Sequence, residues 1–410
     1  MSTAPPPVRT STAVPTDAGG ERTPDPAGGP APSAARRIAR GLRLWYGRAV
    51  VAAALVWLVY AVVRWLVSGR WHWSLILDVV PPLFLVGIPL LLLVAAAAAC
   101  GRRRPVAAAV SGTALALALA TGPGINWPAL WREPGPVPAD ALRVVSLNTQ
   151  YWAMATDSDR LLALLRSRDA DVYLLQEHVG WTPGFGEDGY WPLDDDAELR
   201  RAFPGYHIAR RGELLTVSRF PIVGRYPVGP GPALAFGEEP DFGQVFAREK
   251  VMRTDVAVAG RTLSLYNVHI TVPLALDNLN LLSDFDHDRY LRRKHAWRQA
   301  EFAGLEKDVA ANGNPVLIAG DFNATDAMRS LDGLREVAED ATPANPELLP
   351  LSWKFASLGE FGEDALFNRD LPFFRMDWAF TKGGTTVHRY DFLPTEGISE
   401  HRMQELRITL

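Results

Sequence analysis

The stretch that most constrains the fold is a short apolar run, residues 316–319, that leads into Gly320-Asp321-Phe322-Asn323. The run has the length of a strand and is bounded by Pro and Gly, which favours a buried strand over a helix. Residues two apart in an extended segment point the same way, so Asp321 and Asn323 reach one pocket while Phe322 packs beneath them. A carboxylate and an amide suit a hard cation or phosphate oxygens. An ordinary Asx turn is the alternative interpretation.

Composition divides the chain into a basic N-terminal part and an acidic C-terminal part. Residues 1–33 are rich in Pro, Ala, Gly, Ser and Thr without apolar periodicity, and we expect a disordered tail over residues 1–40. Residues 1–139 carry a net charge of +8, whereas residues 140–410 hold 29 basic and 41 acidic residues, a net charge of −12. This acidity argues against binding of nucleic acid by bulk charge. Cys100 is the only cysteine, which excludes an intrachain disulfide.

Apolar blocks predict a membrane region over residues 41–126 with about three transmembrane helices. The blocks cover about residues 49–67, 81–100 and 106–120. The second block has no charge and, at about 1.5 Å per residue, can cross a hydrocarbon core of about 30 Å. Arg64 lies near the end of the first block, where it is expected to extend to the lipid headgroups. Buried helices of a soluble domain are the alternative interpretation.

Positive charges beside the spans predict their orientation. A basic cluster precedes the first block, and Arg102, Arg103 and Arg104 separate the second from the third, so both groups are expected in the cytoplasm. Three crossings satisfy this rule and place the C-terminal domain outside, whereas two would leave it inside. Residues 127–139 are rich in proline and indicate a stiff linker. We therefore expect a multi-pass protein of the cell membrane that contacts lipids through its N-terminal helices and has an extracytoplasmic domain.

Strand and helix patterns alternate in the C-terminal domain, residues 140–410. Strands are expected at about residues 142–147, 170–175, 212–217, 251–258, 262–268, 375–380 and 404–410, and helices at about 157–168 and within 276–310. Residues 181–201 are acidic and indicate a loop. A strand–helix–strand order with polar residues at the strand ends is typical of a layered α/β arrangement.

The polar candidates for a functional site mostly follow or lie within these strands. They are Asn148, Glu177, His269, Asp321, Asn323, Asp377, Glu400 and His401. Carboxylates can hold a divalent cation, an imidazole can transfer a proton, and amides can orient phosphate, so the set suits metal-assisted cleavage of a phosphoester. For His178 and His207 we favour a structural role.

The order of the motifs resembles the endonuclease/exonuclease/phosphatase superfamily, whose members include DNase I-like deoxyribonucleases and neutral sphingomyelinases. The marks are Ser146-Leu147-Asn148, Leu175-Gln176-Glu177, Ser218-Arg219-Phe220-Pro221-Ile222, Asn267-Val268-His269, Gly320-Asp321-Phe322-Asn323, Met376-Asp377 and Ser399-Glu400-His401. The resemblance implies a four-layered αββα sandwich, two mixed β-sheets flanked by helices, after the transmembrane helices. Three spans before an outward-facing domain also resemble actinobacterial membrane proteins of the teicoplanin-resistance type.

The resemblance also implies metal ligands. Glu177 would bind Mg²⁺, or Mn²⁺ as the alternative ion, and Asn148 would help to hold it. The family usually has Asp before the final His, and this chain has Glu400 there. The longer side chain is expected either to weaken a second metal contact or to enlarge the site.

Catalytic roles follow from the same resemblance. Asp321 and Asn323 would position the attacking water and the scissile phosphate. His401, oriented by Asp377, would be the general base or a phosphate contact. His269 would contact phosphate or act as an acid.

These observations predict a membrane-anchored, Mg²⁺-dependent phosphoesterase that acts outside the cytoplasm. A phospholipid or polyprenyl phosphate is the first expected substrate, because a tethered domain meets lipids at high local concentration. An extracellular nuclease, with nucleic acid as substrate only, is the alternative enzyme. A binding or sensing protein without catalysis is the alternative from another class. No protein partner is expected.

Overall fold

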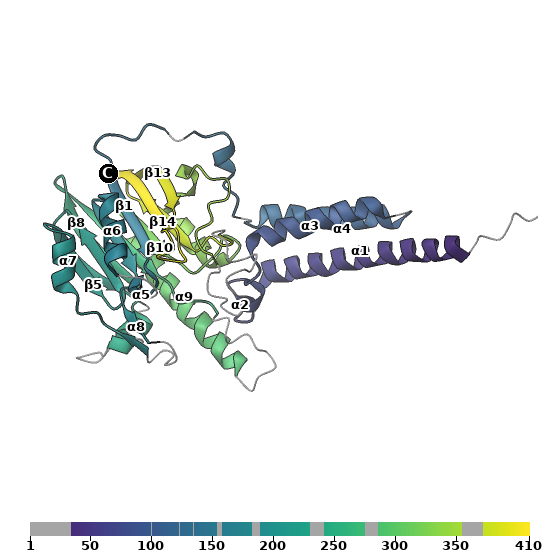
Figure 1. The fold of residues 1–410 in the computed structure, drawn as a ribbon, viewed down its shortest axis with the longest axis horizontal. Helices are drawn as coiled ribbons and strands as arrows, with labels where there is room; N and C mark the ends of the chain where they lie inside the picture. The colour runs from purple at the N-terminus through teal and green to yellow at the C-terminus, as the bar shows by residue number, and fades with distance from the viewer. Residues whose placement is uncertain are drawn as a thin grey trace, which may run out of the picture.

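The computed structural model describes residues 34–99, 101–122, 124–133, 135–153, 158–182, 189–229, 242–274, 286–354 and 372–410. Two sheets face each other in its C-terminal part, and long helices project away from them (Figure 1). Figure 1 shows a helical N-terminal part and an α/β C-terminal part.

The first sheet has the strand order β13-β14-β1-β2-β6-β5. Its strands are β1 (Leu142–Asn148), β2 (Val172–Gln176), β5 (His207–Arg211), β6 (Leu214–Ser218), β13 (Thr386–Leu393) and β14 (Met403–Thr409). β1 and β2 are parallel, and the other neighbours are antiparallel. The first and last strands of the domain therefore lie side by side.

The second sheet has the order β11-β12-β10-β9-β8-β7. Its strands are β7 (Ile222–Val228), β8 (Val251–Val258), β9 (Arg261–His269), β10 (Val316–Asp321), β11 (Glu339–Asp340) and β12 (Asp377–Lys382). Here β9 and β10 are the parallel pair. Both sheets are thus mixed.

Alternation along the strands explains how the layers pack. In β10, Val316 and Ile318 pack against α9 (His287–Ala311), whereas Leu317 and Ala319 pack against the other sheet. Helices α6 (Ser158–Arg168) and α7 (Asp196–Ala202) cover the first sheet in the same way. The result is the expected four-layered αββα sandwich, whose inner core is closed on both sides by sheets.

Several local predictions need correction. Residues 181–201 are not all loop, because α7 begins at Asp196 and β4 (Tyr190–Trp191) pairs with β3 (Gly180–Trp181). The strand expected from residue 212 begins at Leu214. A turn in which Gly212 has a positive φ joins this strand to β5, and the sequence pattern did not predict β5. Edge strands such as β5 and β7 carry mixed polar residues, so periodicity alone does not reveal them.

The three apolar blocks form α1 (Ala34–Val67), α3 (Pro82–Ala98) and α4 (Arg103–Ala120), which lie side by side (Figure 1). Within the described residues, only α1 is both long and apolar enough to cross a membrane. Residues 34–40 of the predicted tail are helical, because α1 begins at Ala34, and residues 1–33 lie outside the described residues. Cys100 lies outside the described residues.

Arg64 corrects another expectation. Its side chain does not extend to headgroups: it is 2% exposed, and its Nε lies 3.2 Å from Oδ1 of the equally buried Asp78. Ser68 Oγ donates to the other oxygen of Asp78 at 3.0 Å. The charge that seemed out of place in an apolar helix is therefore paired inside the protein.

The helices are joined to the sandwich by direct contacts. Asp288 Oδ1 at the start of α9 lies 2.8 Å from His72 Nε2 and accepts from Trp73 Nε1 at 3.0 Å. The buried Asn126 side chain, directly before the predicted linker, donates to the carbonyl of Asn345 at 2.7 Å. Gln299 on α9 also donates to the Gly69 carbonyl. The domain is thus packed on the base of the helices.

Candidate active site

Strand register brings three of the predicted residues into one row. His269 ends β9, Asp321 ends β10 and Asp377 begins β12. Asp321 is paired with His269 on one side and with Asp377 on the other. Since paired residues on neighbouring strands point the same way, the three side chains face the space between the sheets. Residues far apart in sequence thereby form one site.

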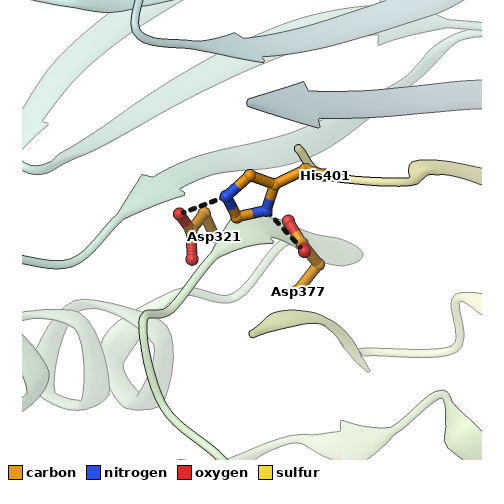
Figure 2. Close-up of side chains that lie close together, drawn as sticks. All are labelled: Asp321, Asp377 and His401. Atoms are coloured by element: carbon orange, nitrogen blue, oxygen red, sulfur yellow. Dashed lines mark hydrogen bonds and ion pairs between the residues drawn. The ribbon is translucent and has the colours of Figure 1, made fainter. Parts of the chain in front are cut away.

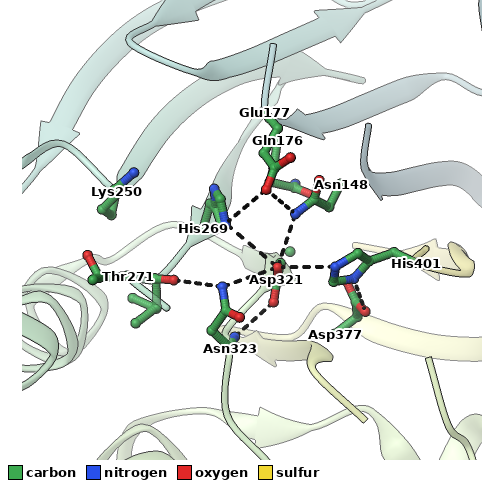
Figure 3. Close-up of polar contacts among 12 residues, drawn as sticks. Asn148, Gln176, Glu177, Lys250, His269, Thr271, Asp321, Asn323, Asp377 and His401 are labelled. Atoms are coloured by element: carbon green, nitrogen blue, oxygen red, sulfur yellow. Dashed lines mark hydrogen bonds and ion pairs between the residues drawn. The ribbon is translucent and has the colours of Figure 1, made fainter. Parts of the chain in front are cut away.

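The first sheet supplies the opposite half of the site. Asn148 ends β1, and Glu177 directly follows β2. Asn148 Nδ2 donates to Glu177 Oε1 at 3.0 Å and to Asp321 Oδ2 at 3.1 Å, so one amide joins carboxylates from both sheets (Figure 3). The structure thus brings Asn148, Glu177 and Asp321 together from both sheets, and their roles in metal binding stay a prediction.

His401 lies between two carboxylates (Figure 2). Its Nδ1 is 2.8 Å from Asp377 Oδ2, and its Nε2 is 3.6 Å from Asp321 Oδ2. Burial alone would lower the pKa of His401, but Asp377 and then Asp321 outweigh burial and raise it to about 10. Because Asp377 accepts from Nδ1, the imidazole is held with Nε2 directed at the centre of the site.

Asp321 and Asn323 form an Asx turn and also direct their side chains into one site, so both interpretations of this motif hold. Asn323 N donates to Asp321 Oδ1 at 2.8 Å, which is an Asx turn. Its Nδ2 donates to the Ile270 carbonyl at 3.0 Å and lies 3.3 Å from Asp321 Oδ2. Phe322 is fully buried beneath them, as expected. The turn fixes both side chains in the site.

His269 has a partner that the sequence did not point to. Its Nδ1 lies 3.0 Å from Oε2 of the fully buried Glu213, whose other oxygen accepts from Lys250 Nζ. Burial opposes protonation of His269, but Glu213 raises its pKa to about 9. The site thus contains a second carboxylate–imidazole pair. The signal in the sequence was a glutamate, Glu213, near the start of an otherwise apolar predicted strand.

Other supporting residues also went unpredicted. Gln176 Nε2 donates to Asn267 Oδ1 at 2.6 Å, and Asn267 Nδ2 donates to the Leu175 carbonyl, so the two sheets are bonded beneath the site. Ser399 Oγ donates to the Asn148 carbonyl at 2.7 Å, which anchors the segment carrying His401. Each lies within a predicted motif, but its partner comes from a distant strand.

Glu400 differs from the other predicted residues. Its backbone N donates to Gln150 Oε1 at 3.0 Å. Within the described part of the chain, its carboxylate forms no hydrogen bond or ion pair with the other candidates. Its role as a metal contact stays a prediction. His178, by contrast, pairs with Asp195 at 2.8 Å outside the site, in line with a structural role, and His207 is exposed.

The donor set fits a divalent cation. Ligand atoms of Asp321, Asp377 and His401 lie within 4.8 Å of one another, and Glu177 and Asp321 share one amide donor. Burial, followed by the nearby Glu213, raises the pKa of Glu177. A cation beside Glu177 would supply the positive charge that keeps this carboxylate ionised. Oxygen-rich, buried sites of this composition suit hard ions such as Mg²⁺.

A mixed two-sheet sandwich with a site of acids, amides and imidazoles at its strand ends defines a layered α/β protein whose site suits phosphoester chemistry. Residues 145–401 match the Endonuclease/Exonuclease/phosphatase family, and the chain belongs to that family. The expectation drawn from the motifs is confirmed at this level. A search of curated proteins found no match.

Solved structures are similar to this chain at low sequence identity. A family protein from Leptotrichia buccalis is 12% identical, with a TM-score of 0.45 over 66% of this chain and 100% of that one. A mannosyl-6-phosphatase from Bacteroides thetaiotaomicron is 16% identical, with a TM-score of 0.41 over 66% and 100%. Truncated TDP2 from Caenorhabditis elegans is 13% identical, with a TM-score of 0.40 over 67% and 99%.

Proposed function

We propose that this chain is a membrane-anchored, metal-dependent phosphoesterase that hydrolyses a lipid phosphoester, of the phospholipid or polyprenyl-phosphate type, outside the cytoplasm. The buried cluster joining Glu177, Asn148, Asp321 and His401 carries the proposal. It combines anionic oxygens for a cation with imidazoles that can hold or release a proton next to it. Family membership makes phosphoester hydrolysis the expected reaction.

Glu177 and Asp321 would hold the ion, with Mg²⁺ the first candidate and Mn²⁺ the second, and Asn148, whose Nδ2 donates to both carboxylates, would help to hold it by positioning them. When bound, it would polarise a phosphate oxygen and stabilise the charge that develops there. Positive charge at this position also lowers the pKa of neighbouring imidazoles, which the carboxylates otherwise raise.

The remaining steps belong to the side chains. Asp377 orients the His401 imidazole, whose Nε2 would take a proton from the attacking water. Asp321 and the Asn323 amide would position that water and a phosphate oxygen. Glu213 raises the pKa of His269 and so favours its protonated form, with which His269 would contact phosphate or donate a proton to the leaving group.

A lipid substrate is supported by the N-terminal helices. Val56 and Val59 on α1 are 70% and 60% exposed, and Leu91 and Val94 on α3 are 70% and 72% exposed. Apolar surfaces of this kind are typical of contact with lipid. Since the domain packs directly on the base of these helices, its site would stay close to the membrane surface. This architecture also supports the likeness to teicoplanin-resistance-type membrane proteins.

Hydrolysis by the full chain in nanodiscs would test the function. Phospholipids, polyprenyl phosphates, plasmid DNA and an aryl phosphate would each be offered with Mg²⁺ or with EDTA. We expect metal-dependent hydrolysis of a lipid class, reduced about a thousandfold in His401→Ala, because the imidazole transfers the proton. His207→Ala, an exposed histidine outside the site, is the matched control.

Two results would contradict this proposal. Cleavage of DNA alone, with activity falling steeply as salt rises, would identify a nuclease. No cleavage of any substrate by the folded chain would favour a binding or sensing protein.

Membrane orientation has a separate test. Three crossings place Cys100 on the cytoplasmic side, so a membrane-impermeant thiol reagent should label it only in opened cells. Because Cys100 is the only cysteine, the labelling needs no other substitution. Labelling in intact cells would exclude the proposed orientation.

A further inference from the structure

Four aromatic rings form a continuous wall beside the catalytic residues. The aromatic wall consists of Tyr151, Trp181, Tyr190 and Phe246. The Tyr151 ring centroid lies 5.0 Å from that of Trp181 and 5.5 Å from that of Tyr190, and Tyr190 stacks on Phe246 at 4.5 Å. All four side chains are partly exposed. None of them belongs to a hydrophobic core cluster of the described residues.

Two residues of the wall touch the catalytic machinery. The backbone N of Tyr151 donates to Glu177 Oε2 at 3.0 Å. Beside Phe246, Lys250 Nζ lies 4.1 Å from the ring centroid and donates to Glu213, the partner of His269. The wall therefore runs along the side of the site that Glu177 and His269 form.

The chain holds this wall in place at a conformational cost. Gln150, Tyr151 and Trp152 are three consecutive residues at positive φ, 51°, 52° and 51°, a region that residues with a Cβ seldom occupy. Trp152 N donates to the Glu177 carbonyl, which helps to hold the turn. A strained turn persists only where surrounding contacts impose it, and such turns concentrate at functional sites. This one directs Tyr151 to the wall and its amide to a metal-ligand candidate.

We propose that the aromatic wall is the subsite for a ring-bearing group attached to the scissile phosphate. This inference rests on the proposed phosphoesterase function and specifies its substrate class. Faces of aromatic side chains bind flat or ring-shaped groups by stacking, whether these are sugar or cyclitol rings or nucleobases. The hydroxyls of Tyr151 and Tyr190, which lie 3.3 Å apart, add polar groups at the edge of the wall. A flexible acyclic group would gain less from these faces and lose more entropy on binding.

Binding of phosphonates tests the wall independently of catalysis, because their P–C bond is not an ester and is not hydrolysed. Benzylphosphonate, cyclohexylmethylphosphonate and n-heptylphosphonate contain equal numbers of carbon atoms, and only the first two contain a ring. Calorimetry would use the full chain in nanodiscs with Mg²⁺, with empty nanodiscs as the blank. We expect the ring compounds to bind about tenfold more tightly than the heptyl compound.

Variants separate the wall from general hydrophobicity. Trp181→Leu and Tyr190→Leu remove a ring from two different strands, and each should reduce the ring preference severalfold. Tyr190→Phe keeps the ring and should keep the preference. Tyr226→Leu, a 46% exposed tyrosine on β7, is the matched control outside the wall. Unfolding temperatures of all variants would identify any that fail to fold.

The outcomes distinguish this inference from the proposed function. Equal binding of the three phosphonates, or a preference that survives in both Leu variants, would overturn the subsite. Ring preference without hydrolysis of any phosphoester would support the wall and overturn the phosphoesterase function. Stronger binding of the benzyl compound would indicate a base-like group, and stronger binding of the cyclohexyl compound a sugar-like group.

Discussion

Among single residues, Glu213 shows most clearly how the environment sets chemistry. It is fully buried between His269 and Lys250. Although burial opposes ionisation, these two cations lower its pKa from 4.5 to about 2. Its lowered pKa stabilises the folded state above about pH 4.5, and this stabilisation is lost as the pH falls towards 2.

Glu213→Gln should remove this pH dependence. A pKa difference of this size corresponds to about 3 kcal/mol of unfolding free energy between pH 6 and pH 2. We therefore expect the unfolding temperature of the wild type to fall more than that of the variant over this range. The variant should also be less stable at pH 6, because Lys250 and His269 lose their carboxylate. Glu336→Gln, an exposed residue of α10 (Asp332–Val337), should leave the wild-type pH dependence intact.

Glu213 also shows the limit of sequence reasoning at this scale. Asn148, Glu177, His269, Asp321, Asn323, Asp377 and His401 could be predicted because each lies in a local motif at a strand end. Glu213 acts through His269, which lies 56 positions away in the sequence, and Glu213 belongs to no such motif. Partners of this kind depend on which strands become neighbours, and that information is not local.

At the level of elements, Gly320 explains why β9 and β10 can place His269 beside Asp321. A Cβ on Gly320 would lie 2.0 Å from the carbonyl oxygen of Val268 on the neighbouring strand. The two backbones are therefore closer here than any other residue would allow. Their approach is a requirement for the site as well as for the sheet.

Gly320→Ala should force these strands apart. We expect a loss of about 3 kcal/mol in unfolding free energy, measured by denaturation, together with loss of hydrolysis because Asp321 moves. Gly313→Ala is the matched control, since nothing lies within 4 Å of a Cβ there. If Gly320→Ala had the same unfolding free energy as the wild type, the sheet would accommodate the added side chain and the prediction would be wrong.

Elements with strong periodicity were the predictable ones. The hairpin of β8 and β9 and the helix α6 match their predicted ranges closely, because apolar alternation or an apolar stripe specifies each. The helix α7 was missed because acidic residues dominate its first turn, where they favour a helix N-terminus but resemble a loop. Composition and local structure disagree at such positions.

At the scale of the whole molecule, Asn126 joins the N-terminal helices to the C-terminal domain. Its side-chain amide donates to the carbonyls of Thr342, Asn345 and Glu347, and its backbone N donates to that of Leu348. The residue directly before the predicted linker is thus bonded to the domain. Pro and Gly content indicated stiffness, but it could not reveal this docking.

Asn126→Ala should loosen that junction. Loss of these hydrogen bonds is expected to cost about 2 kcal/mol, because the carbonyls of Asn345 and Glu347 lose the Asn126 amide as a donor. We expect limited proteolysis of the full chain in nanodiscs to cut within residues 127–139 faster than in the wild type. Trp131→Leu, a 70% exposed residue of the same segment, should be cut at the wild-type rate. Equal rates of proteolysis for the wild type, Asn126→Ala and Trp131→Leu would show that Asn126 does not hold the junction.

The pairing of β1 with β14 has a consequence for the timing of activity during biosynthesis. Asn148 ends the first strand of the domain, and His401 stands just before β14, so the two halves of the candidate site meet only after synthesis has passed His401. Under the proposed function, a nascent chain would therefore be unable to hydrolyse its substrate before that point. Ribosomes would handle only an inert precursor, and premature hydrolysis would be avoided without a separate inhibitor.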